Sequence, residues 1–88
     1  MLTLATTNLF EKNLKKMLKR GKDKEKLKAV INFLMTQQPL PPKYKDHILV
    51  GNWQGFRECH IEPNWLLIYQ ITTEKLILTD TGTHADLF

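Results

Sequence analysis

Residues 56–81 read FRECHIEPNWLLIYQITTEKLILTDT, and this stretch decides the fold. It contains three runs rich in β-branched, aromatic and other apolar residues, at 56–61, 65–71 and 75–81. Pro63-Asn64 breaks the first pair of runs, and residues 72–74 break the second. Because connections this short join neighbouring strands in opposite directions, the second half of the chain is predicted to form three antiparallel strands.

The first half of the chain has the spacing of two amphipathic helices. Asn8 is expected to cap the first helix, with Glu11 completing a capping box, and Gly21 is expected to end it. Asp23 is expected to cap the second helix, and the short hinge between them predicts an antiparallel helical hairpin. The apolar faces repeat at helical spacing: Phe10, Leu14, Met17 and Leu18, then Leu27, Val30, Ile31, Leu34 and Met35.

Residues 37–44 contain three prolines and separate the helical half from the strands. Residues 2–4 alternate briefly and fit a short opening strand. The predicted order is therefore β-α-α-β-β-β and the predicted class is α+β, with a helical hairpin packed on one face of a small, twisted, mainly antiparallel sheet. A chain of 88 residues is expected to form one domain, 1–88.

The positive charge is concentrated in the helical half. Residues 11–28 carry nine Lys or Arg against three acidic residues, whereas residues 29–88 carry four against six. This pattern predicts a partner that bears phosphates or many carboxylates, and a merely solvated lysine-rich face is the plain alternative. Cys59 is the only cysteine, so no internal disulfide is possible. With no secretion signal and no long apolar run, we expect a cytoplasmic protein without membrane contact.

Three histidines are the candidates for chemistry: His47, His60 and His84. Strand alternation predicts that Glu58 and His60 share one face, with Arg57, Cys59 and Ile61 on the other. Imidazole titrates near neutral pH, so it can act as the base, the acid or the cationic donor when a ribose 2′-hydroxyl attacks its own phosphodiester. Taken alone, a histidine in a strand is more often a packing residue. A zinc site is disfavoured because gaps of 13 and 24 residues match no common ligand spacing.

Several further residues are candidates for RNA contacts. Trp53 lies in a polar turn between two glycines, where an exposed ring could stack on a base. Lys43 and Lys45 could contact phosphates, and so could Arg57, although its predicted strand face opposes that of His60. Phe88 is the final residue and would be frayed unless it docks beside the site.

An ordered pattern across the second half resembles the YafQ family of RelE-type bacterial toxins. The pattern is Lys45-Asp46-His47-x-Leu49-x-Gly51-x-Trp53-x-Gly55-Phe56-Arg57-Glu58-Cys59-His60-Ile61-x-Pro63-x-Trp65-x-x-Ile68-Tyr69, closing with Thr81-Gly82-Thr83-His84-x-x-Leu87-Phe88. The resemblance covers about half the chain. The helical half fits the family in length and lysine content but carries no motif of its own.

The resemblance implies a RelE-like fold and an endoribonuclease, an mRNA interferase, that cuts messenger RNA on the translating ribosome without metal or other cofactor. It also implies a cognate antitoxin, expected to be acidic and of the DinJ type. Matched position by position, His47, His60 and His84 correspond to the essential histidines of the family. Glu58 corresponds to an acid beside His60, and Phe88 to a terminal aromatic that supports the site.

Two departures from the family pattern bear on mechanism. Where relatives often read Pro-Asp-Trp, this chain has Asn64, which cannot take a proton and could only orient a group or bind phosphate. Asp80 stands where many relatives have a basic residue, and its carboxylate would repel phosphate unless it is turned away or paired.

The expected division of labour has His47 as general base, His84 as general acid and His60, beside Glu58, as stabiliser of charge. The roles of base and acid could be exchanged. Two other classes of function remain open: a non-catalytic RNA-binding module on the same scaffold, and a protein-interaction domain whose lysines meet an acidic partner.

Overall fold

The computed structural model describes residues 2–88, and its elements follow the predicted order with two additions. The predicted parts are β1 (Thr3–Thr6), α1 (Asn8–Lys19), α2 (Lys24–Met35), β3 (Arg57–Glu62), β4 (Trp65–Ile71) and β5 (Lys75–Gly82). The additions are a two-residue strand, β2 (His47–Ile48), and a short C-terminal helix, α3 (His84–Leu87). Two 3₁₀ turns, Pro42–Tyr44 and Gly51–Trp53, lie on either side of β2.

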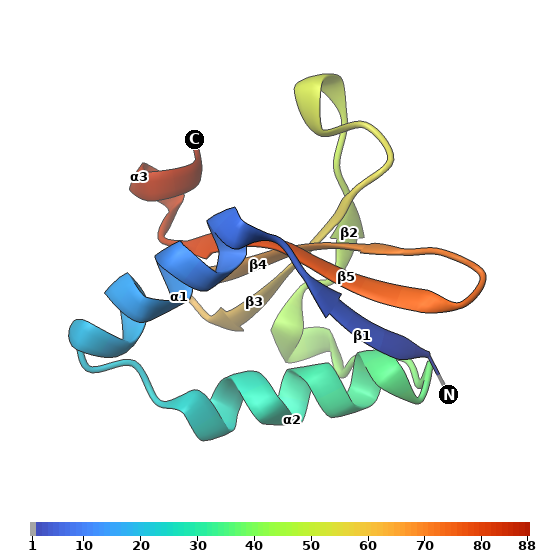
Figure 1. The fold of residues 1–88 in the computed structure, drawn as a ribbon, viewed down its shortest axis with the longest axis horizontal. Coiled ribbons are helices and arrows are strands. Elements are labelled where there is room, and N and C mark those ends of the chain that lie inside the picture. Colours follow the sequence, from blue (N-terminus) through green and yellow to red (C-terminus); the bar gives the residue numbers. More distant parts are fainter. Residues whose placement is uncertain (1) are drawn as a thin grey trace.

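The strands form one sheet in the order β1-β5-β4-β3-β2. The neighbours β2–β3, β3–β4 and β4–β5 are antiparallel, whereas β1 runs parallel to β5. The predicted class and the mainly antiparallel sheet are confirmed, and the three long strands begin and end within one residue of their predicted bounds. Figure 1 shows α1 and α2 lying along the sheet, with α3 at the far end of β5 beside α1.

The predicted cap of α1 was wrong by one residue. Thr7, not Asn8, is the cap: its backbone is extended, and its hydroxyl oxygen accepts a hydrogen bond from the Phe10 amide at 3.0 Å. The same hydroxyl donates to the Thr79 carbonyl at 2.7 Å, so this cap also ties the helix to β5. That long-range bond is what favours Thr7, and local spacing does not reveal it.

The predictions for the hinge between the helices are confirmed. Asp23 caps α2 by accepting from the Glu25 amide at 2.9 Å. Gly21 follows the end of α1 with φ +92°, a left-handed conformation that glycine adopts without strain. The chain therefore leaves α1 and enters α2 within a few residues.

One face of the sheet packs against α1 and α2 to form the hydrophobic core. Alternate residues of the three long strands point into it, together with the predicted apolar faces of the helices. Its buried members include Phe10, Met17, Leu27, Val30, Leu34, Cys59, Ile61, Trp65, Leu67, Tyr69, Leu76 and Leu78. Phe10 thus has the core position that the helical spacing predicts, and Trp65, Tyr69 and Cys59 of the strands pack in the same core.

The other face of the sheet carries the polar residues of interest on an apolar floor. In the antiparallel register of β3 and β4, Glu58 lies opposite Ile68 and His60 opposite Leu66. Leu66 and Ile68 are completely buried. Charged and polar groups on this face therefore lie against apolar side chains, where the local dielectric constant is low. Their electrostatic interactions are stronger there than in water.

Asp80 is turned away from solvent and paired. Its side chain is almost fully buried, and one carboxylate oxygen accepts hydrogen bonds from the Asn13 side-chain amide at 2.7 Å and the Thr81 backbone amide at 2.8 Å. The Asp80 carboxylate is therefore not presented at the protein surface, where it would repel phosphate most directly.

Candidate active site

The three histidines, far apart in the chain, come together at one end of the sheet. His47 lies on β2, His60 on β3 and His84 at the first position of α3. The ring centroids of His47 and His60 are 6.3 Å apart, and those of His60 and His84 are 5.5 Å apart. His60 is thus the middle member of a three-imidazole cluster, on the scale of a single phosphate group.

Glu58 is the carboxylate of this cluster. β2 pairs with β3 so that His47 lies directly opposite Glu58. One carboxylate oxygen is 3.4 Å from Nε2 of His47 and 3.7 Å from Nε2 of His60. The Glu58 side chain is buried, and its second oxygen, Oε2, has no hydrogen-bond partner among residues 2–88. Because a buried, under-paired negative charge is costly, this carboxylate favours a positive charge on the rings beside it.

His47 is oriented by a hydrogen bond on one side of its ring and by a carboxylate on the other. Nδ1 lies 2.7 Å from the Lys45 carbonyl oxygen, and Nε2 faces Glu58. Lys45 has φ +49°, and this left-handed residue ends the 3₁₀ turn just before β2. Since a carbonyl oxygen can only accept, Nδ1 carries the hydrogen in the contact with Lys45.

The surroundings of His60 favour the neutral form of its ring. Burial lowers the pKa of its imidazole below the usual value, because desolvation disfavours the charged form. Glu58 and the Pro63 carbonyl oppose this shift, while His84 and Lys45 add to it. The net direction is downward, so His60 is neutral at neutral pH.

His84 is held by Asn64. The side-chain oxygen of Asn64 accepts a hydrogen bond from the His84 backbone amide at 3.1 Å, and Nδ1 of His84 lies 2.9 Å from the same oxygen. Because that oxygen can only accept, Nδ1 must carry the hydrogen, and Nε2 of the neutral ring keeps its lone pair. Asn64 therefore fixes the tautomer of His84, as an orienting group does in other sites.

The helix that starts at His84 is anchored on both sides. Thr83 and Asp86 form a capping box, and Arg20 at the end of α1 pairs with Asp86 at 2.8 Å. The Arg20 hydrogen bond, followed by that of the Thr83 amide, lowers the pKa of Asp86 to about 2. A Cβ on Gly82 would lie only 2.9 Å from the Cβ of Asp86, so glycine is needed for this close approach.

The candidate RNA-contact residues differ in their surroundings. Lys43 lies with Nζ 5.0 Å from the centroid of the Tyr44 ring, and Lys45 is exposed. Arg57 is held by Asp46 at 2.9 Å, and the same carboxylate accepts from the Tyr69 hydroxyl. The hydrogen bond to Asp46 raises the pKa of Arg57 further. In contrast to Lys43 and Lys45, Arg57 is therefore already paired with a carboxylate.

The two aromatic candidates, Trp53 and Phe88, differ in how far their rings are exposed. Trp53 packs edge-on against Phe56, with centroids 5.6 Å apart, and is only partly exposed. Phe88 is 63% exposed, and its backbone amide donates to the His84 carbonyl at 2.9 Å. Its ring is thus tethered one turn from His84 and open to solvent.

Sequence reasoning missed three parts of this site. The Lys45 carbonyl behind His47, the Asn64 contact to His84 and the Arg20–Asp86 tether all join residues through backbone turns or distant elements. The one available signal was Thr83 followed by Asp86 three residues later, the spacing of a capping box. Across residues 2–88, no group of three or more His, Cys, Asp or Glu side chains is arranged to hold a metal ion, and no helix is both long and apolar enough to cross a membrane.

Comparisons with known proteins agree on one family. A family model described as "Bacterial toxin of type II toxin-antitoxin system, YafQ" matches residues 2–88. The chain is 48% identical over 80 residues to the mRNA interferase toxin YafQ of Escherichia coli strain K12, an alignment that covers 90% of this chain and 87% of that protein.

Solved structures give the same result for the fold. A chain of the E. coli DinJ–YafQ complex superposes with a TM-score of 0.91 and 43% identity, covering 100% of this chain and 99% of that one. A metal-bound toxin from Helicobacter pylori superposes with a TM-score of 0.94 and 48% identity, covering 100% of both chains.

The position of Glu58 predicts how the cluster titrates. In a Glu58→Gln variant the pKa of His60 should fall below its value in the unaltered protein, because the carboxylate is the largest influence that raises it. The measurement is an NMR titration of the carbon-bound imidazole protons. Glu74→Gln, an exposed residue in the β4–β5 turn, is the matched control and should leave the titration unchanged. An unchanged or higher pKa in the Glu58 variant would contradict the arrangement.

Proposed function

Because the chain belongs to the YafQ family of bacterial type II toxins, we propose that it cleaves messenger RNA with the three-imidazole cluster of His47, His60 and His84. Its relatives in E. coli carry the name mRNA interferase toxin, which denotes an endoribonuclease. The observation that carries the proposal for this chain is the convergence of three imidazole rings, two of which contact the buried carboxylate of Glu58.

The reaction we propose is a transesterification within the RNA. The 2′-oxygen of a ribose forms a bond to the adjacent phosphorus, and the bond from phosphorus to the 5′-oxygen of the next nucleotide breaks. The proton of the 2′-hydroxyl goes to a base, and the departing 5′-oxygen takes a proton from an acid. The products are a 2′,3′-cyclic phosphate and a 5′-hydroxyl, and no water or metal enters the step.

The hydrogen bonds of the cluster favour His84 as base and His47 as acid. His84 donates from Nδ1 to Asn64, so the neutral ring offers the lone pair of Nε2 to the 2′-hydroxyl. Nε2 of His47 faces the carboxylate of Glu58, so we assign His47 as the acid that gives the 5′-oxygen its proton. The sequence predicts His47 as base and His84 as acid but also allows the reverse, and we assign the reverse.

His60 completes the site in a supporting role. Its lowered pKa keeps the ring neutral at neutral pH, and a neutral imidazole still donates one hydrogen bond. We assign that donor to a non-bridging oxygen of the phosphate, which on binding replaces the Pro63 carbonyl as its acceptor and on which charge grows during the reaction. Phe88, tethered to His84 and exposed, is placed to contact the base beside the scissile bond.

The lysine-rich helices form a second, larger surface for contact with RNA. α1 and α2, with the residues between them, carry the nine basic residues of the 11–28 segment, and most of their side chains are exposed. We propose that this surface docks on ribosomal RNA, bringing the site to a translated message, with Lys43 and Lys45 nearer the cut. Binding of this kind weakens steeply with salt because it releases counterions.

A DinJ-like antitoxin is the partner we infer. The E. coli relative has been solved in complex with DinJ, and the basic helices here suit an acidic binding partner. Cytoplasmic location is part of the same proposal, because messenger RNA and ribosomes are there. An RNA-binding module without catalysis would share these surfaces, so the discriminating observation is cleavage itself.

The ends left on the RNA test the reaction. Incubated with message-programmed ribosomes, the protein should leave 2′,3′-cyclic phosphate and 5′-hydroxyl ends, and a 2′-deoxy sugar at the cut should block cleavage. His60→Ala and His84→Ala should each slow cleavage about 100-fold or more. Lys75→Ala, an exposed lysine at the start of β5, is the control and should cut normally.

Other ends would point to other chemistry. Products with 5′-phosphate and 3′-hydroxyl ends would indicate an activated water and refute the transesterification; the metal-bound relative from H. pylori makes this comparison informative. Binding without any cleavage would favour the RNA-binding module. Parallel reactions on naked RNA measure how far cleavage depends on the ribosome.

Asn64→Asp tests which histidine is the base. The new carboxylate would lie beside Nδ1 of His84 and extend to higher pH the range over which that ring is charged. If His84 is the base, the acidic limb of the pH profile of single-turnover cleavage moves to higher pH. Movement of the alkaline limb instead would restore His84 as the acid. Asn52→Asp, in an exposed turn, is the control and should move neither limb.

A further inference from the structure

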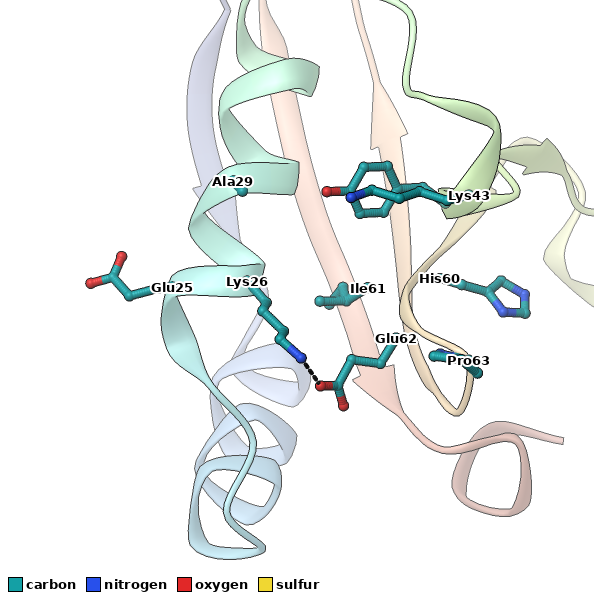
Figure 2. A pocket seen from close by; sticks show the side chains of 9 residues that line it. Glu25, Lys26, Ala29, Lys43, His60, Ile61, Glu62 and Pro63 are labelled. Atoms are coloured by element: carbon teal, nitrogen blue, oxygen red, sulfur yellow. Dashed lines mark hydrogen bonds and ion pairs between the residues drawn. The ribbon is translucent and has the colours of Figure 1, made fainter.

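A pocket of about 520 Å³ lies on the other side of β3 from the histidine rings. Its walls come from the first turns of α2, the 3₁₀ turn Pro42–Tyr44 and the end of β3. Figure 2 shows Lys43 reaching from that turn toward α2, Lys26 joined to Glu62 beside the pocket, and the His60 ring pointing out on the far side of the strand. Its volume is in the range of pockets that hold small ligands.

The pocket and the histidine cluster share one residue. His60 contributes to both, since its ring belongs to the cluster and the residue also lines the pocket. Within residues 2–88, β2 pairs only with Arg57 and Glu58 of β3, and beyond them β3 contacts the 3₁₀ turn Pro42–Tyr44 in place of a strand. The nucleotide next to a phosphate at the cluster would reach the pocket past this turn, which supplies Lys43 and Tyr44 to the lining.

The charges in the pocket leave one cation available. Glu62 is neutralised by Lys22 at 3.0 Å and Lys26 at 2.7 Å. Glu25 also lines the pocket and pairs at 3.6 Å with Lys28, which does not line it. In contrast, Lys43 forms no ion pair within residues 2–88 and lies over the Tyr44 ring.

The lining therefore combines an aromatic ring with an unpaired ammonium group. Single-stranded nucleic acids are commonly bound by this combination, in which a base stacks on the ring and a phosphate meets the cation. The carboxylates of Glu25 and Glu62 do not strongly oppose the binding of a phosphate, because both are paired with lysines.

We propose that this pocket is a nucleotide subsite, which binds the nucleotide adjoining the scissile phosphate, with its base against Tyr44 and its phosphate at Lys43. The proposal rests on the proposed function, in that it requires a phosphate at the histidine cluster. It adds that the protein holds the message at two neighbouring points, which aligns the 2′-oxygen with the bond to be broken.

The test uses an uncleavable trinucleotide of adenosine with 2′-deoxy sugars at its first two positions. Added to the isotope-labelled full chain, it should shift the imidazole resonances and also the amide resonances of Ala29 and Ile61, which line the pocket. Lys43→Glu should weaken binding about tenfold and lower the salt slope of log affinity by about 1. Lys75→Glu is the control of equal charge change.

A second variant addresses the base. Tyr44→Leu keeps an apolar side chain against Phe33 but removes the stacking surface, and it should also weaken binding about tenfold. Circular dichroism checks that each variant is folded. Shifts confined to the histidines, or equal weakening by the Lys43 and Lys75 substitutions, would overturn the subsite while leaving the proposed cleavage intact. Cleavage is judged separately, from the RNA ends.

Discussion

A buried carboxylate between two imidazoles is the interaction on which the candidate site depends. Glu58 is almost inaccessible to solvent, and one of its oxygens has no partner within residues 2–88. Such a charge is tolerated only with a counter-charge nearby, and His47 and His60 are the groups within reach. The cluster is therefore polarised before any substrate binds. Of these two rings His60 is the more buried, and its desolvation lowers its imidazole pKa.

The rest of the fold serves to hold this arrangement in place. The antiparallel register of β3 and β4 sets Glu58 and His60 over the buried Leu66 and Ile68. The third ring depends on a longer chain of contacts, because α3 is short and could not hold His84 alone. Its capping box and the Arg20 tether connect the C-terminus to α1, so the helical layer also positions part of the site.

Much of the fold could be predicted because its signals are local. Strand alternation and the breaks at Pro63 and at the β4–β5 turn fixed three strands, and Asp23 marked the start of α2. The parallel pairing of β1 with β5 and the bond from the Thr7 hydroxyl to the Thr79 carbonyl join residues more than 70 positions apart, which no local pattern encodes. The same holds for the site. Alternation placed His60 beside Glu58, but the Asn64 contact to His84 joins the β3–β4 turn to the start of α3 and required the structure.

The most direct measurement of the central claim is a titration of the full chain with inorganic phosphate, followed through the imidazole resonances of His47, His60 and His84. If the three rings share one phosphate group, all three resonances move together and give a single dissociation constant. The constants should stay equal as salt is raised, even while the affinity falls. Movement of one ring alone, or three unrelated constants, would contradict the account.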